Sequence, residues 1–362
     1  MKQFWLTLGI CLMAGLFPEA SLGGVESRSQ SPFSLSSHHL NGIADSNNIG
    51  APPLIGQQLD PFDVRQLDER AGIAYQEGRY QDAEALLRQA IASDPDYIQA
   101  YEHLGLVLMA QGDLNGALEI LQQGIALQPD YPLLHFTLGD VLVSQGRLSG
   151  AVAAYRQAIE LDENFTPAYV NLGLALGFQN RLTDAIEVLR QGYGRAPEDV
   201  QLSTTLILML RHDGQISQAM EIARQGIRYY PDSPVFYNDL GLLLAIEGQL
   251  QAAEEAYGQA LERAADSTTA AIVYTNLGNL FDDHGHFERA IAAYEQALEQ
   301  DPTLPATHYD MGLALERRGQ LEAARDAYQV ALELEPDFVA AREHLRQVER
   351  RLAENAPDTL PR

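Results

Sequence analysis

Glycines, alanines and prolines recur along this chain with a shared period of 34 residues. The recurring glycines are Gly105, Gly139, Gly173, Gly241, Gly278 and Gly312. The recurring alanines are Ala83, Ala117, Ala151, Ala185, Ala219, Ala253, Ala290 and Ala324, and the recurring prolines are Pro95, Pro129, Pro197, Pro231, Pro302 and Pro336. All three sets share one interruption, which lengthens the step from Ala253 to Ala290 to 37 residues. A chain with this internal repeat folds as a stack of similar units.

The segment 271–304 shows how one unit is built. A first helix is expected at about Ile272–Asp283, because apolar residues recur there at helical spacing. Residues 284–286 form a turn, and a second helix begins at Phe287. Pro302 ends the second helix, because proline has no amide to donate and disfavours helix in the residue before it. Each unit is therefore a helix-turn-helix pair, whose remaining apolar surface is buried by stacking on its neighbours.

The pattern resembles that of the tetratricopeptide repeat family, whose consensus places aromatic, small and proline residues at fixed offsets. In this unit the offsets are filled by Tyr274, Leu277, Gly278, Phe281, Gly285, Ala290, Tyr294, Ala297 and Pro302. Eight units are expected, beginning near Arg65, Gln99, Leu133, Pro167, Gln201, Val235, Ile272 and Ala306. The resemblance covers residues 64–338. It implies an all-α, right-handed superhelical solenoid of eight helix-turn-helix repeats at residues 63–338, with a capping helix and short tail at 339–362.

Two further features of the sequence bear on how the repeats pack and end. Three additional residues near Asp266–Thr269 lengthen the sixth connection, and we expect less regular packing there. The last helix, at about Asp337–Ala353, carries only a narrow apolar stripe. Arg346 occupies the place where the repeats have glycine, so no further helix is expected to pack closely against it. A polar outer face of this kind is typical of the helix that ends a solenoid.

The N-terminal region differs from the repeats. Residues 1–23 combine Lys2, an uncharged and mostly apolar run from Phe4 to Phe17, and small residues after Pro18, which together indicate a secretory signal peptide. An uncleaved membrane anchor is the alternative. Residues 24–62 are rich in Ser, Gly, Asn and Pro, and we interpret them as a flexible linker. We therefore expect an exported protein, in the periplasm or a comparable compartment of a bacterium, or one anchored to a membrane by its N-terminus.

Charge and composition exclude several classes of function. The chain has 50 acidic residues against 24 Lys and Arg, a net charge of -26, which disfavours binding to nucleic acid or to anionic lipid. Its single lysine, Lys2, excludes a phosphate-binding GK[ST] loop elsewhere in the chain. The best metal-binding candidate, residues 282–286 (Asp-Asp-His-Gly-His), lies in a turn where polar residues are expected in any case. We therefore expect no catalytic residues, no metal and no cofactor.

The resemblance also implies a place for a partner. In this family, residues at the second, fifth, ninth and twelfth places of the first helix line a concave groove. The candidate groove residues that we select are Leu106, Met109, Phe136, Asp140, Val170, Leu174, Leu208, Asn238, Leu242, Asn279 and Tyr309. Arg211 is the lone cation at the fifth, ninth and twelfth places, so the basic clamp that some members use for a carboxylate is absent. The alternative is that these leucines pack against the next helix and belong to the core.

The function expected from the sequence is that of an exported, non-enzymatic scaffold or assembly factor. Its partner would be a protein or peptide, with a helical or extended apolar segment lying in the groove. The alternative is an adaptor that presents or regulates an envelope enzyme. The fold alone does not decide between these two.

Overall fold

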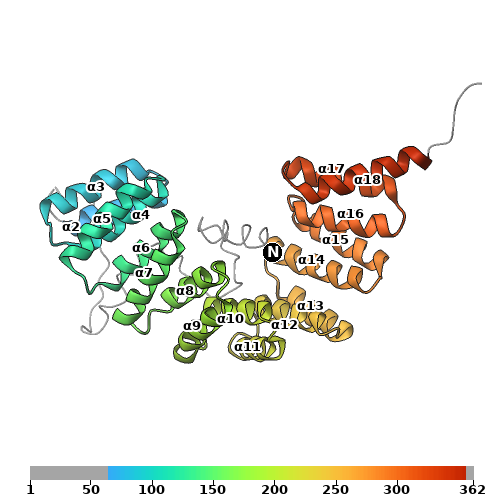
Figure 1. Cartoon of the computed structure of the whole chain (residues 1–362), viewed down its shortest axis with the longest axis horizontal. Helices are drawn as coiled ribbons and strands as arrows, with labels where there is room; N and C mark the ends of the chain where they lie inside the picture. The colour runs from blue at the N-terminus through green and yellow to red at the C-terminus, as the bar shows by residue number, and fades with distance from the viewer. Residues whose placement is uncertain (1–63, 356–362) are drawn as a thin grey trace, which may run out of the picture. The chain divides into compact units, whose positions relative to one another are not determined.

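The structure, a computed structural model, describes residues 64–355, which form seventeen α-helices, α2 to α18, and no strand (Figure 1). The first helices of the eight pairs, here called helices A, are α2 (Val64–Gln76), α4 (Ile98–Ala110), α6 (Pro132–Ser144), α8 (Thr166–Phe178), α10 (Val200–His212), α12 (Pro234–Ile246), α14 (Ser267–Asp283) and α16 (Pro305–Arg317). The second helices, helices B, are α3 (Tyr80–Ser93), α5 (Leu114–Leu127), α7 (Leu148–Leu161), α9 (Leu182–Arg195), α11 (Ile216–Tyr229), α13 (Leu250–Arg263), α15 (Phe287–Gln300) and α17 (Leu321–Leu334). The last helix, α18 (Val339–Asn355), stands alone after the eighth pair. The all-α repeat fold expected from the sequence is confirmed.

The helices belong to two compact units, which divide between Thr205 and Leu206, inside α10. The described part of the first unit holds α2 to α9 and the start of α10. The described part of the second unit holds the end of α10 and continues to α18. From α2 to α9 in the first unit and from α11 to α18 in the second, each helix packs against the next one along the chain, as expected for a repeat array.

The recurring glycines permit the close approach of helices A and B. A Cβ atom on Gly278 of α14 would lie 2.4 Å from Cε1 of Tyr294 on α15, well inside van der Waals contact. Tyr294 is almost completely buried, at 1% exposure. The turn between the two helices contains Gly285 at φ 74°, a backbone conformation that glycine adopts without steric cost. Both glycines are therefore required by geometry that repeats along the chain.

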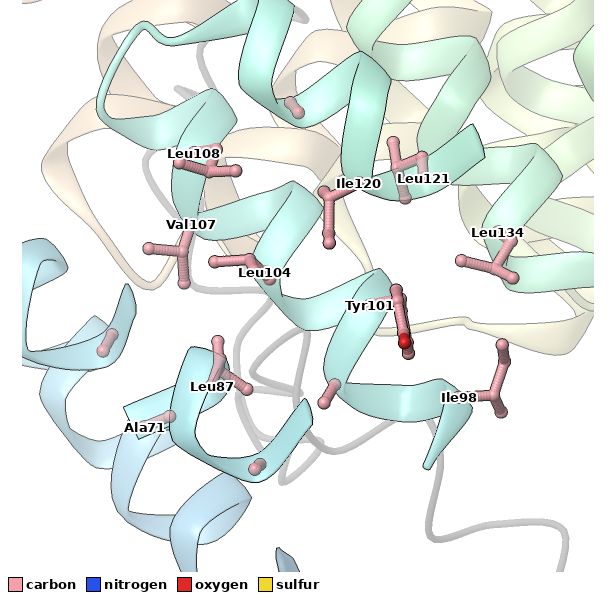
Figure 2. Packing of buried hydrophobic residues seen from close by; sticks show 14 of the residues in the cluster. Ala71, Leu87, Ile98, Tyr101, Leu104, Val107, Leu108, Ile120, Leu121 and Leu134 are labelled. Carbon is pink, nitrogen blue, oxygen red and sulfur yellow. The ribbon is translucent and has the colours of Figure 1, made fainter. Parts of the chain in front are cut away.

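The core of the first unit lies between its helices (Figure 2). Leu104 of α4 is fully buried and belongs to one apolar cluster with Leu87 of α3, Leu121 of α5 and Leu134 of α6. Neighbouring helix pairs of the first unit thus share this apolar cluster. Burying a leucine in this way contributes about 1.5–3 kcal/mol, so the stability of a helix pair depends on the pairs next to it.

The core of the second unit ends under α18. Ala341 and Val348 of this helix are fully buried, and Leu345 and Leu352 pack against the cluster around Tyr328. These four residues are the narrow apolar stripe that the sequence predicts. The rest of the helix is largely exposed and charged, which is consistent with a cap.

The additional residues in the sixth connection extend a helix and do not lengthen a loop. The sequence predicts a helix A from Ile272, whereas α14 begins at Ser267. The Asp266 side chain caps this earlier start, because its carboxylate accepts hydrogen bonds from the backbone N–H (2.8 Å) and the hydroxyl (2.9 Å) of Thr269. An Asp that caps the first turn of a helix stabilises it by about 1 kcal/mol. The predicted start of this helix is therefore wrong, because the apolar period does not reveal the capping residue, and the expectation of less regular packing stays a prediction.

The predicted signal peptide (residues 1–23), the predicted linker (residues 24–62) and the end of the tail lie outside the described residues. Among residues 64–355, no helix is both long enough and apolar enough to cross a membrane.

Candidate partner-binding face

Each helix A presents side chains at four equivalent places of its repeat, the fifth, sixth, ninth and twelfth. The places are counted from Ile98 in α4 and from the matching residue in the other repeats. We call the side chains at these places the helix-A face. The repeat keeps these places in register from pair to pair. In the first unit α4 contacts α6, and in the second unit α12 contacts α14 and α14 contacts α16. Residues at equivalent places on these helices are therefore neighbours across adjacent repeats.

The apolar candidates on this face differ in exposure. Val170 and Leu174 of α8 are buried, at 3% and 6% exposure. Leu106, Leu208 and Leu242 at the ninth place are only partly buried, as is Met109. Leu106 and Leu242 therefore keep part of their apolar surface available, whereas Val170 and Leu174 belong mainly to the core.

Two aromatic candidates pack against other aromatic rings. Phe136 contacts Tyr155 at 5.8 Å and Phe165 at 5.0 Å between ring centroids. Tyr309 contacts Phe338 at 4.9 Å, with Tyr328 and His344 also in contact. These contacts hold both rings in place, and each ring remains partly exposed.

The three polar candidates make hydrogen bonds within the chain. Asp140 Oδ1 accepts from the Tyr155 hydroxyl (2.6 Å) and from Asn171 Nδ2 (2.9 Å). Burial raises the pKa of Asp140 to about 7, although both donors oppose the shift. The remaining two are Asn238, which accepts from Asn276 Nδ2 at 2.9 Å, and Asn279, which accepts from the Tyr294 hydroxyl at 2.6 Å.

These bonds belong to a pattern that was not predicted from the sequence. A polar residue at the sixth place of a helix A bonds to a polar residue at the fifth or ninth place of the preceding helix A. The pairs are His103 with Asp68 (2.6 Å), Thr137 with Glu102 (3.3 Å), Asn171 with Asp140 (2.9 Å) and Asn276 with Asn238 (2.9 Å). The sequence does carry a signal for these bonds, because polar residues recur at the sixth place among apolar neighbours. We call these bonds the sixth-place pairs.

The first of these pairs lies within a buried charged cluster. His103 Nδ1 lies 2.6 Å from Asp68 Oδ1, and its Nε2 lies 3.3 Å from Glu102 Oε2. The Tyr97 hydroxyl donates to the other oxygen of Asp68 at 2.9 Å. Burial alone would lower the pKa of His103, but the carboxylates of Glu102 and Asp68 outweigh it and raise that pKa. The cluster joins α2 to α4 and has little contact with solvent.

Asp239 and Asp310 also occupy the sixth place, but they form no such pair. The Oδ2 atom of Asp239 is shielded from solvent and has no hydrogen-bond partner among the described residues. Burial raises the pKa of Asp239 to about 7, and nearby Arg211 opposes the shift. Burial likewise raises the pKa of Asp310 to about 7, with a further contribution from Asp282. Asp239 therefore has one carboxylate oxygen that is shielded from solvent and lacks the hydrogen bond found in the four sixth-place pairs.

Three histidines of the repeats make contacts with backbone carbonyls. His135 and His308 stand where other repeats have tyrosine, and their Nε2 atoms lie 2.8 and 3.0 Å from the carbonyls of Pro129 and Pro302. In the turn at residues 282–286, His284 Nδ1 lies 2.8 Å from the Leu280 carbonyl. Within residues 64–355, no group of three or more His, Cys, Asp or Glu side chains is arranged to hold a metal ion.

Family models for tetratricopeptide repeats match most of the described chain. One model matches residues 74–135, a second residues 139–177, a third residues 170–234 and 275–337, and a fourth residues 232–303. No curated protein sequence matches the chain significantly.

Solved structures share the fold at low sequence identity. A tetratricopeptide repeat protein from Parabacteroides merdae is 15% identical, with a TM-score of 0.52, over 70% of this chain and 98% of that one. The structure titled APC/C hetero-tetramer Cut9-Hcn1 contains a chain that is 18% identical, with a TM-score of 0.51, over 79% of this chain. The match spans 56% of that second chain's own length. These likenesses show a common fold.

Proposed function

The chain belongs to the tetratricopeptide repeat family, and on that premise we propose that it is an exported, non-enzymatic scaffold that binds a protein partner along its helix-A face. The observation that carries the proposal is the match of family models from residue 74 to residue 337. Repeats of this family support protein–protein interaction as the general function. Export rests on the features of residues 1–23.

The helix-A face offers two kinds of contact to a partner. Leu106, Leu208 and Leu242 are partly exposed, and covering the exposed part of such a side chain contributes roughly 25 cal/mol per Å² of apolar area. In the second unit, Asn238 is held in a fixed position by its hydrogen bond with Asn276 before a partner arrives. A pre-ordered face loses less conformational entropy on binding than a flexible one. An apolar segment, helical or extended, suits such a face.

A crosslinking pull-down from native envelope tests this proposal. The scaffold function predicts that the full chain recovers structural or membrane subunits. The adaptor alternative predicts instead the recovery of an active enzyme whose turnover depends on the chain. If the crosslinked chain recovers no protein above the level of a heat-denatured control, the proposed function is wrong.

A further inference from the structure

Three titratable side chains, His103, Asp68 and Glu102, lie in contact inside the first unit, and we call them the histidine cluster. His103 Nδ1 of α4 lies 2.6 Å from Asp68 Oδ1 of α2, and its Nε2 lies 3.3 Å from Glu102 Oε2. Glu102 Oε1 also accepts a hydrogen bond from Thr137 of α6 at 3.3 Å. The three titratable side chains are only 1%, 12% and 5% exposed. The cluster therefore links three successive helices A away from solvent.

The geometry of the cluster fits a histidine ring that carries two protons. A neutral imidazole donates through one ring nitrogen and presents a lone pair at the other. Whichever nitrogen holds the proton, the lone pair of a neutral His103 ring would face a carboxylate, either Asp68 or Glu102. A doubly protonated ring instead turns a positive N–H toward each carboxylate, and charge-assisted contacts of this kind are strong. Loss of one proton leaves two buried carboxylates beside a neutral ring, which is costly.

Two tyrosines from neighbouring segments face the carboxylates and do not supply positive charge. The Tyr97 hydroxyl, just before α4, donates to Asp68 Oδ2 at 2.9 Å. Tyr131, just before α6, interacts with both Glu102 and Asp68. Burial raises the pKa of both tyrosines well above the ordinary value of 10.0. Both hydroxyls therefore stay neutral between pH 6 and pH 9 and do not titrate together with the histidine.

Two charged residues complete the surroundings of the cluster. Arg65 of α2 interacts with Tyr97, but it is exposed to solvent, so the positive charge inside the cluster comes from His103. Asp140 of α6 interacts with Glu102, and burial raises the pKa of Asp140 to about 7. The hydrogen-bond partners of Asp140 lie on α7 and α8, so its titration acts on a different set of helices.

The pKa values in the cluster move in the direction that this geometry requires. Burial alone would lower the pKa of His103, but Glu102 and Asp68 outweigh burial and raise it. Burial raises the pKa of Glu102, against the effects of His103 and Thr137. Both shifts have the same sign, so protonation stabilises the folded arrangement. This stabilisation is complete below the ordinary histidine value of 6.5, and it is lost as the pH rises through the higher folded-state value.

The histidine cluster lies where the first described helix pair meets the second. Leu67 of α2, Leu87 of α3 and Leu104 of α4 belong to one apolar cluster, and α3 packs against α4. Burial of apolar surface does not depend on the charge of His103, so the histidine cluster is the part of this junction that a proton controls. Among the described helices, α2 and α3 have a neighbouring pair on one side only, and terminal repeats open more readily than internal ones.

We propose that the histidine cluster is a pH-sensitive switch, which holds α2 and α3 against α4 while His103 is positively charged and releases them when the ring becomes neutral. The proton that leaves the ring goes to solvent. Asp68 and Glu102 occupy fifth places of the repeat, so the switch acts at one end of the helix-A face. A buried histidine beside an interface is a general device for such a transition. The inference goes beyond the proposed function and does not depend on it.

Hydrogen–deuterium exchange of the full chain, followed by mass spectrometry at pH 6 and pH 9, tests the switch. Exchange rates are corrected for the intrinsic effect of pH, and peptides from α2 and α3 are compared with peptides from α9 of the same unit. We expect the open population of α2 and α3 to be about tenfold larger at pH 9 than at pH 6. That change follows if the open state binds the proton about ten times more weakly than the closed state. Protection of α9 should not change.

Glu102→Gln is the main variant. It removes one of the two buried carboxylates, and its amide can donate to Nε2 of a neutral His103 ring. Opening of α2 and α3 should then change by no more than about twofold between the two pH values. Glu119→Gln is the matched control, because Glu119 is exposed on α5 of the same unit, and it should keep the tenfold change. An equal pH dependence in wild type and Glu102→Gln would overturn the inference, as would a similar increase of exchange in α9.

Nuclear magnetic resonance gives a second measurement, which does not need the Glu102→Gln variant. The ring signal of His103 is assigned as the one missing from the spectrum of His103→Asn. In the wild type this ring should titrate with a midpoint above 6.5, the ordinary histidine value. A midpoint below that value would overturn the inference, because the ring would then be neutral in the closed arrangement at neutral pH.

Discussion

Substitution of Asp239 by asparagine should stabilise the protein in a pH-dependent way. One oxygen of the Asp239 carboxylate, Oδ2, is shielded from solvent and has no hydrogen-bond partner among the described residues. Its pKa is raised from 3.8 to about 7 by burial, despite the attraction of Arg211. Because the folded-state pKa is raised, the stabilising contribution of the protonated group is complete below pH 4. This contribution is lost as the pH rises through about 7.

The size of the effect follows from the same shift. A carboxyl whose pKa moves from 3.8 to about 7 opposes folding by about 4 kcal/mol above pH 7, which is an upper bound because the side chain can turn toward water. We expect Asp239→Asn to raise the free energy of unfolding by about 1–3 kcal/mol at pH 8, the range for an unsatisfied buried polar group. At pH 5 the native Asp239 is protonated while the carboxyl of the unfolded chain is still ionised, so the difference should be clearly smaller than at pH 8 without vanishing.

Denaturant unfolding followed by circular dichroism at pH 5 and pH 8 measures the effect. Asp232→Asn is the control, because Asp232 is exposed in the same unit and its substitution should change stability by no more than about 0.5 kcal/mol at either pH. If Asp239→Asn destabilises the chain equally at both pH values, Asp239 has a structural partner in solution. The argument from its missing hydrogen bond would then be refuted.

Two further predictions concern packing. Gly278→Ala should destabilise the fold by about 1–3 kcal/mol, because the new Cβ would lie 2.4 Å from the Tyr294 ring, whereas Gly258→Ala, with no atom within 4 Å, should stabilise it by about 0.5–1 kcal/mol. Thermal melting of the two variants checks both signs, and equal shifts would contradict the close approach of α14 and α15. Leu174→Glu should lower the melting temperature sharply, because it places a carboxylate where only 6% of the side chain is exposed. An unchanged melting temperature would show that Leu174 faces solvent.

The sequence determines the fold of this chain unusually directly. The 34-residue period places a glycine such as Gly278 opposite a tyrosine such as Tyr294, and this local fit fixes both helices and their distance. The start of α14 was predicted five residues too late, because the apolar period begins at Ile272 while the capping residue, Asp266, lies before it. A cap depends on one side chain and adds nothing to a periodic pattern.

The candidate partner-binding face was less predictable, because exposure depends on neighbouring repeats. The period gives Leu174 and Leu242 the same place, but Leu174 is buried and Leu242 is partly exposed. The period also gives Asn171 and Asp310 the same place, but only Asn171 has an acceptor on the preceding helix A. A single-sequence analysis sees the place of a residue and does not see the partner that another repeat provides. The role of these residues in binding stays a prediction.

Site-specific photocrosslinking tests the central claim most directly. A photoreactive amino acid is placed at Leu242, on the helix-A face, or at Glu295, on the exposed surface of helix B α15. Each chain is then irradiated in cells of its native host. We predict that Leu242 gives one dominant crosslinked protein that Glu295 does not give, and that excess unlabelled chain competes it away. Equal crosslinking from both positions, or crosslinking from Glu295 alone, would contradict a partner bound along the helix-A face.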